Sequence, residues 1–270
     1  MPRTKSRVLL RSVVHAMSLV DLIHSAGLRV STAFLHRLAA AHKRLRRLTW
    51  PLLIRRTPFR RVVRLGDQRR PIASLTSIVA VTEPWSVSIH DGPLRAFVDR
   101  TYDFDHGHLS LQGACVATLA GAYLHTPTGL VCTGEGELVI DSVKKIERHL
   151  DAAAGVDLSS ARRLPGDCST VMCKPHDNYY HWFNDCVLRL YVLQRRPEQT
   201  PVTILVPPTL RPYQMQSLRY CLPERAAVEC VADPWVRVER LVLPSFITDP
   251  LVGLIPPAAL AYVHDRVVAG

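Results

Sequence analysis

Residues 178–190 read NYYHWFNDCVLRL, and residues 200–208 read TPVTILVPP. The first stretch runs into apolar residues at helical spacing, whereas the second is a short apolar run bounded by prolines, which is typical of a buried parallel strand. Residues 209–220 and 257–268 suit helices, and AAVECV (226–231) and VERLVLPS (238–245) suit strands. Helices and strands therefore alternate from about residue 178 onward, which predicts an α/β fold.

Residues 71–142 precede this region and predict strands joined by turns. The segments SIVAVTE (77–83) and ACVATLAGAYLHTPTGLVCTGEGELVID (114–141) are rich in β-branched residues and punctuated by Gly and Pro. We expect turns at Thr128-Gly129 and at residues 134–136, because glycine tolerates the backbone conformations that tight turns require. Residues 143–154 are expected to be helical.

The positive charge of the chain lies in its first 65 residues. Residues 1–65 hold 15 Lys and Arg side chains and one acid, Asp21, whereas the remaining residues carry a slight excess of acids. Apolar residues recur there at helical spacing, namely Phe34, Leu38, Ala41, Leu45 and Leu48. The pattern predicts one or two basic amphipathic helices, which would either bind an anionic membrane surface or pack on the core. Nucleic acid is not an expected partner, because basic charge without a recognised motif is a weak signal.

Cysteine usage and hydropathy indicate a cytoplasmic protein, and the basic amphipathic segment would place it on the inner face of the membrane. The seven cysteines are odd in number and irregularly spaced, which favours reduced thiols. No run of about 20 uncharged apolar residues exists, and charged or polar residues interrupt the first apolar stretch. We therefore expect a basic amphipathic helical segment, residues 1–70, and an α/β domain, residues 71–270.

Polar side chains form one stripe along the predicted helix at 178–194. At 100° per residue, Asn178, His181, Asp185 and Arg189 fall within about 80° of one another. Asp185 can orient His181 and stabilise its charge, so the pair can act as a general base. An ordinary solvated helix face with i,i+4 pairs would show the same spacing. The aromatic residues beside His181 suit a sugar or another flat ligand, and they also suit a core.

The stretch NYYHWFNDCVLRL resembles the central motif of glycosyltransferase family 61. The matching positions are Asn178, Tyr180, His181, Trp182, Asp185, Arg189 and Leu190. Val187-Leu188 departs from the motif, in which a proline usually precedes the arginine. The hairpin-like GLVCTGEGELVIDS (129–142) before the motif, and the strand-like TILVPP and RLVLPS after it, extend the resemblance over roughly residues 110–268.

The resemblance implies the N-terminal, acceptor-side half of a GT-B-like enzyme, in which a β-hairpin region precedes a Rossmann-like layer. Such enzymes transfer a sugar from a nucleotide-sugar donor to a polysaccharide or glycan acceptor with inversion, and the donor is a substrate, so no cofactor is expected. His181 or Asp185 would be the base, and Asn178, Tyr180 and Trp182 would bind substrate. Arg189 would either bind substrate through an anion contact or have a structural role. The family continues into a donor-binding half, which we expect this chain to lack after Gly270. The alternative is a catalytically inactive, truncated relative that binds a glycan or a protein partner.

Two further constellations could hold a metal, and neither is expected to. Asp103 and Asp105 form an Asp-x-Asp pair, but so short a pattern arises often by chance and suits a polar turn. Several thiols and imidazoles gather near the motif, namely Cys168, Cys173, His176, His181 and Cys186. Their spacings miss the close cysteine pairs of zinc sites, so these thiols are expected to be small buried hydrophobes.

Overall fold

The structure is a computed structural model that describes residues 59, 61–88, 108–111, 113–144, 146, 149, 156–174, 176–248 and 255–269. The chain divides into two units, Met1–Thr57 and Pro58–Gly270, and the described residues all belong to the second. The basic amphipathic helices predicted before residue 59, and the Asp103–Asp105 pair, lie outside the described residues. At the end of the basic segment the helix prediction is wrong: Arg61–Val63 is a strand, β1, because it pairs in parallel with a strand of the main sheet.

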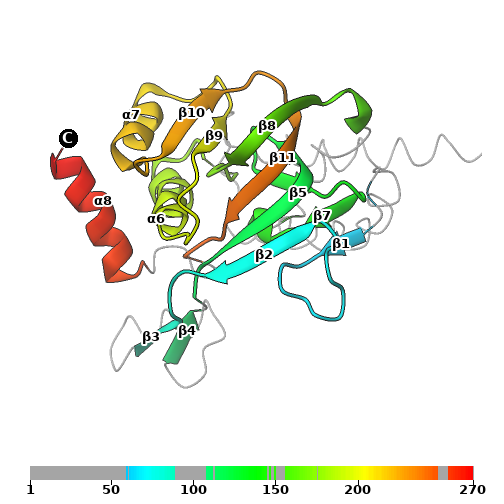
Figure 1. Ribbon diagram of the computed structural model, residues 1–270. Helices are drawn as coiled ribbons and strands as arrows, with labels where there is room; N and C mark the ends of the chain where they lie inside the picture. The colour runs from blue at the N-terminus through cyan, green and yellow to red at the C-terminus, as the bar shows by residue number, and fades with distance from the viewer. Residues whose placement is uncertain are drawn as a thin grey trace, which may run out of the picture. The chain divides into compact units, whose positions relative to one another are not determined.

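The main element of the second unit is a nine-stranded mixed sheet (Figure 1). Its strands follow the order β1-β7-β6-β5-β11-β8-β9-β10, and β2 pairs with β5 beside this path. Their bounds are β1 Arg61–Val63, β2 Leu75–Ala80, β5 Cys115–His125, β6 Leu130–Cys132, β7 Glu137–Val139, β8 Arg162–Ser169, β9 Val202–Val206, β10 Ala226–Cys230 and β11 Trp235–Pro244. Strands β3 (Trp85–Ser88) and β4 (His108–Leu111) form a separate antiparallel pair.

Helices join the parallel strands. One continuous helical stretch leads from β8 to β9 and consists of α5 (Tyr179–His181), the π-helical segment η4 (Trp182–Val187) and α6 (Leu188–Gln194). Helix α7 (Pro212–Cys221) leads from β9 to β10, and α8 (Pro257–Ala269) follows β11. Short 3-10 turns occur at η1 (Ile140–Ser142) and η3 (Leu158–Ser160). No helix in the described part of the chain is long and apolar enough to cross a membrane.

Most element predictions are confirmed. TILV forms the buried strand β9 with a parallel partner on each side, and the expected strands at 226–231 and 238–245 are β10 and β11. The helices expected at 209–220 and 257–268 are α7 and α8. Of the helix expected at 143–154, the structure describes only Val143, Lys144, Ile146 and His149, so that prediction remains untested. The fold class is α/β, as the alternation indicated.

The order of the parallel strands creates a topological switch point between β8 and β11. From β8 the chain moves to its neighbour β9 and on to β10, and it then returns to β11 on the other side of β8. Both β9 and β11 pair with β8 in parallel. In open α/β sheets, ligands bind beyond the carboxyl ends of the strands at such a point. A ligand site is therefore expected among the residues that follow Ser169 and Pro244.

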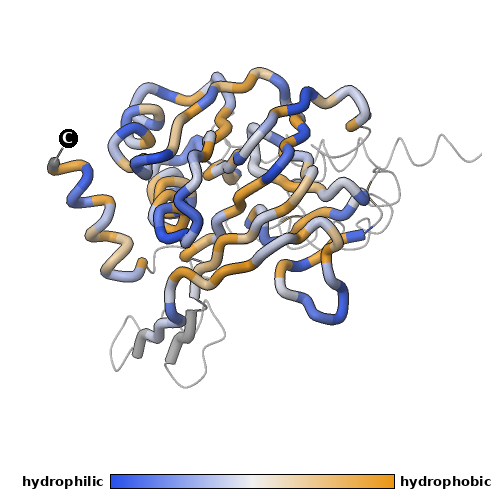
Figure 2. The backbone as a smooth tube through the Cα atoms, in the orientation of Figure 1, coloured by the Kyte–Doolittle hydropathy of each residue, from blue (hydrophilic) through white to orange (hydrophobic). Residues whose placement is uncertain are grey.

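Apolar side chains form a core on each face of the sheet. Along β11, Val242 belongs to the core beneath the helices, whereas Leu241 and Leu243 belong to the core on the opposite face, as the two-residue period of a strand requires. Helix α6 contacts β5 and β11, and α8 contacts α6 and α7, so α8 forms the outer helix of that side. Figure 2 shows hydrophobic residues along the central strands and hydrophilic ones at many of the loops.

Gly129, in the turn between β5 and β6, allows a close approach of two backbone segments. Its φ is +73°, and a Cβ at this position would lie 2.1 Å from the carbonyl oxygen of Met172. Both the left-handed backbone and the contact exclude other residues without a shift of the chain. The turn predicted from Thr128-Gly129 thus also fixes the segment that leaves β8, since that segment includes Met172.

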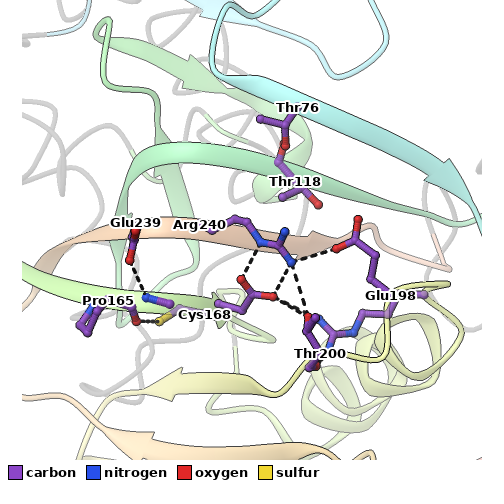
Figure 3. A network of polar contacts seen from close by, with 11 residues as sticks. Thr76, Thr118, Pro165, Cys168, Glu198, Thr200, Glu239 and Arg240 are labelled. Carbon is purple, nitrogen blue, oxygen red and sulfur yellow. Dashed lines mark hydrogen bonds and ion pairs between the residues drawn. The ribbon is translucent and has the colours of Figure 1, made fainter.

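A polar network ties β8 and β11 to the loop before β9 (Figure 3). Arg240 donates two hydrogen bonds to Asp167, from Nε to Oδ1 at 2.5 Å and from Nη2 to Oδ2 at 2.6 Å, and a third from Nη2 to Glu198 at 2.9 Å. The hydroxyl of Thr200 also donates to Asp167, at 2.7 Å. Burial would raise the pKa of Asp167, but the hydrogen bonds and charge of Arg240, with help from Thr200, hold that pKa below its ordinary value.

We expect Arg240→Gln to lower the free energy of unfolding at pH 7 by roughly 1 kcal/mol, because the bidentate pair is partly exposed. A carboxylate whose pKa is lower in the folded state contributes its full stabilisation above its ordinary pKa, near 4. It loses this stabilisation as the pH falls through its pKa in the folded state. The cost of Arg240→Gln should therefore shrink below pH 4. Urea unfolding at pH 7, 4 and 3 measures it, with the exposed β8 residue Arg163→Gln as control. An equal cost at all three pH values would contradict the ion-pair explanation.

Candidate active site

Asn178 begins the helical stretch that carries the motif. Its backbone is extended, and its side-chain oxygen accepts hydrogen bonds from the backbone N–H groups of Tyr180, at 2.9 Å, and His181, at 3.3 Å. Two N–H groups that the first helical turn leaves unpaired are satisfied in this way. Asn178 is therefore the N-cap of this stretch, and its side chain bonds the backbone N–H of His181.

The turn after His181 is π-helical, in contrast to the continuous α-helix predicted for residues 178–194. Residues Trp182–Val187 form this wider turn, and the side chain of Asn184 donates to the carbonyl oxygen of Tyr180 at 2.8 Å within it. Asp185 lies inside the π-helical segment. Such segments occur often at functional sites, because the extra residue changes the direction in which the side chains point.

Asp185 is the centre of the candidate site. It is 2% exposed and accepts hydrogen bonds from three side chains. Lys144 Nζ lies 2.7 Å and Thr248 Oγ1 lies 2.9 Å from Asp185 Oδ1, and His181 Nδ1 lies 2.8 Å from Oδ2. Lys144 also donates to the Thr248 hydroxyl at 2.8 Å. Both carboxylate oxygens are thus occupied by donors from three other parts of the chain.

His181 connects this buried carboxylate to the surface. Its side chain is 29% exposed, whereas that of Asp185 is 2% exposed. A carboxylate that accepts from a lysine and a hydroxyl also accepts from the imidazole, so Nδ1 carries the hydrogen and Nε2 carries the lone pair. The second nitrogen of His181 is therefore left to take a proton from a bound molecule.

The site lies beyond the switch point of the sheet. Thr248 follows the end of β11 at Pro244, and the segment of Met172 follows the end of β8 at Ser169. Arg189 holds the helix to both ends: Nε and Nη2 donate to the carbonyl oxygen of Pro244 at 3.0 and 2.6 Å, and Nη1 donates to that of Met172 at 3.1 Å. This is the edge at which α/β sheets bind ligands.

Of the two roles predicted for Arg189, the structure supports the structural one and not the substrate contact. It is fully buried, and its guanidinium stacks on Phe246 at 4.6 Å from the ring centroid. Burial lowers the pKa of Arg189 to about 10, so the side chain remains charged at neutral pH. Its donors are directed to backbone carbonyl oxygens, and it is therefore a positioning residue that fixes the helix on the sheet.

The aromatic residues of the motif separate into buried and exposed ones. Trp182 is fully buried, and its indole N–H donates to Ser217 of α7 at 2.8 Å, so it joins two helices instead of contacting a substrate as predicted. Tyr180 is 52% exposed, and its ring meets that of His181 edge-on at 5.7 Å. Of the predicted site residues, the structure brings together Asn178, Tyr180, His181 and Asp185.

Lys144 and Thr248 are site residues that the sequence did not reveal. They lie 41 and 63 residues from Asp185 along the chain, and neither belongs to a recognisable motif. Lys144 is 12% exposed at its side chain, and its ammonium lies 5.2 Å from the centroid of the Phe246 ring. Only the sheet topology, which places the segment after β11 beside the helix, could have suggested Thr248.

The thiols and imidazoles near the motif do not converge on one point. Cys173 and Cys186 lie with their sulfur atoms 3.4 Å apart in the core, whereas Cys168 belongs to the core on the opposite face of the sheet. In the part of the chain that the structure describes, no three His, Cys, Asp or Glu side chains are placed to hold a metal ion. Burial raises the pKa of the Cys168 thiol to about 11.

Comparisons with models of known protein families, with curated proteins and with solved structures found no significant match to this chain.

We expect Lys144→Met to lower the free energy of unfolding by about 3 kcal/mol, because it leaves the buried carboxylate of Asp185 without its cation. Thr248→Val removes one neutral donor and should cost about 1–2 kcal/mol. Urea unfolding at pH 7 measures both effects. Lys174→Met, at an exposed lysine, is the matched control. A cost for Lys144→Met no larger than that of the control would show that Lys144 does not support Asp185.

Proposed function

We propose that the chain is a glycosyltransferase that transfers a sugar from a nucleotide-sugar donor to a polysaccharide or glycan acceptor with inversion. The observation that carries the proposal is the pair of His181 and Asp185 beyond the switch point of the sheet. In this pair a partly exposed imidazole is held by a buried carboxylate at 2.8 Å. The resemblance of residues 110–268 to glycosyltransferase family 61 supports the same assignment.

In the proposed reaction His181 is the general base. Its Nε2 takes the proton of the acceptor hydroxyl while that oxygen bonds to the anomeric carbon of the donor. The bond from this carbon to the nucleoside diphosphate breaks, and its electron pair leaves on the diphosphate oxygen. Asp185 stabilises the imidazolium that forms. Asp185 is too buried to contact an acceptor, so it is assigned as a positioning residue and the base is His181 alone.

A GT-B-like domain is the finer fold that we propose for the second unit. The parallel strands β11, β8, β9 and β10, with α6 and α7 between successive strands, support a Rossmann-like layer. The antiparallel pairs β5–β6 and β6–β7 support the preceding hairpin region. The proposed unit is the acceptor-side domain, because it contains the base. The nucleotide sugar is a substrate, and no cofactor forms part of the proposal.

Attachment to the cytoplasmic face of an anionic membrane is proposed for residues 1–65. The support is the excess of 15 Lys and Arg over one acid in that segment, because basic amphipathic helices bind anionic headgroups. We expect the whole chain to pellet with vesicles that contain phosphatidylserine and to lose most of this binding in 0.5 M salt. A chain without residues 1–57, which keeps strand β1 and the second unit whole, should lose the binding; equal pelleting of that chain would contradict the proposal.

Glycan or partner binding without transfer is the second candidate function. The exposed rings of Tyr179 and Tyr180 favour it, because tyrosines combine an apolar face with a polar tip and are common at binding surfaces. The two functions differ in what they require of His181. Transfer needs its imidazole as the base, whereas binding alone tolerates its loss.

We expect His181→Ala to lower the turnover number by about 10²–10⁴-fold, the range for the loss of a general base. Release of nucleoside diphosphate from a panel of nucleotide sugars, in the presence of mixed glycan acceptors, measures turnover. His264→Ala is the matched control, because His264 also pairs with an aspartate, Asp265, at 3.1 Å, but on the exposed surface of α8. A full rate for folded His181→Ala would exclude His181 as the base, and no turnover by the native chain would favour the binding function.

A further inference from the structure

Tyr179 stands on an aromatic platform at the start of the helical stretch. Its ring lies 4.8 Å from that of Phe183 and 5.3 Å from that of Tyr213, measured between centroids. Phe183 and Tyr213 pack against the core beneath the helices, whereas Tyr179 is 65% exposed. We use the name aromatic platform for these three residues. One ring is thus fixed by two others from below and keeps much of its own surface open to water.

A fixed and exposed tyrosine ring is suited to a sugar. It presents a large apolar face at a low cost in conformational entropy, and its hydroxyl offers a hydrogen bond at the edge. A pyranose ring has the complementary structure, since its C–H groups form an apolar face and its hydroxyl groups form a polar rim. The hydroxyl of Tyr213 is buried and has no hydrogen-bond partner in the described part of the chain. Tyr213 therefore takes part in the platform through its ring, because its hydroxyl is not open to a ligand.

The platform and the proposed base lie on opposite flanks of the same helical turn. At 100° per residue, Tyr180 is directed about 100° away from each of Tyr179 and His181 around the helix axis, so these two lie on nearly opposite sides with Tyr180 between them. A helix with its side chains is about 10–12 Å wide, a distance that roughly two or three linked sugar rings span. Tyr180, 52% exposed and in edge contact with His181, continues the aromatic surface from the platform to the base.

We propose that the aromatic platform binds a sugar unit of the acceptor that lies remote from the reacting hydroxyl. The acceptor then crosses Tyr180, and its terminal hydroxyl reaches Nε2 of His181. This inference rests on the proposed transferase function, and it names the class of acceptor: an oligosaccharide chain of at least two units, in place of a single sugar. The contribution of Tyr179 to binding distinguishes an oligosaccharide acceptor from a single sugar.

Binding by oligosaccharides of increasing length tests the inference. Glucose with cellotetraose, and N-acetylglucosamine with chitotetraose, serve as probes in titrations followed by saturation-transfer NMR on the whole chain. We expect a tetrasaccharide to bind more tightly than its monosaccharide. Tyr179→Ala should weaken the tetrasaccharide about 3- to 10-fold, as for one lost aromatic contact, and leave the monosaccharide unchanged. Tyr179→Phe keeps the ring and should bind the tetrasaccharide nearly as the native chain does.

The outcome separates this inference from the proposed function. His181→Ala should keep the tetrasaccharide affinity, because the platform does not include the base. Tyrosine-dependent tetrasaccharide binding without any turnover would support the platform and overturn the transferase function. Turnover with equal affinities of native and Tyr179→Ala chains for every probe, or no binding of any probe, would overturn the platform. Circular dichroism of each variant confirms that the exposed substitution leaves the fold intact.

Discussion

The carboxylate of Asp185 is the group on which the candidate site depends. Two segments that are distant in the sequence reach the helical stretch here, and each supplies a donor to Asp185: Lys144 after η1 and Thr248 after β11. His181, four residues before Asp185 on the same stretch, supplies the third donor. A buried carboxylate needs such partners, because an unpaired charge in the interior is strongly unfavourable. The need to pair one carboxylate therefore fixes the relative positions of three segments and, through Nδ1, the orientation of the one exposed imidazole among them.

Arg189 supplies a second constraint one helical turn further on. Its guanidinium contacts the carbonyl oxygens of Met172 and Pro244, so a single side chain joins the segment after β8 to the end of β11. The carbonyl of Met172 also lies where a Cβ of Gly129 would be, so this backbone position depends on a glycine in the β5–β6 turn. The β5–β6 turn, the strand ends and the helix are thus linked by contacts through Arg189, Met172 and Gly129. These contacts hold in place the helical stretch that carries Asp185 and His181.

The sequence was informative where a physical pattern is local. The apolar run TILV bounded by prolines predicted β9, and the i,i+4 spacing of His181 and Asp185 predicted their pairing. The sequence was not informative where the position of a side chain depends on contacts with residues that are distant in the chain. The helical wheel put Arg189 in the same polar stripe as His181, but the strand ends offer carbonyl oxygens at that level, and the arginine is buried against them. Trp182 likewise turns inward because Ser217 offers a partner to its indole N–H. Nothing in the local sequence marks Lys144 or Thr248, since their role comes from topology alone.

A stability argument alone does not explain the pair of Lys144 and Asp185. The loss of either partner leaves the other charge buried and unpaired, yet replacing both by apolar residues of similar size is often neutral or even stabilising. A buried ion pair is therefore weak evidence for a purely structural role. The same carboxylate holds the partly exposed imidazole of His181 beyond the switch point of the sheet, and an apolar pair could not do this. The retention of a charged centre in an otherwise apolar core fits a site in which His181 gains and releases a proton, because the imidazolium needs a fixed anion beside it.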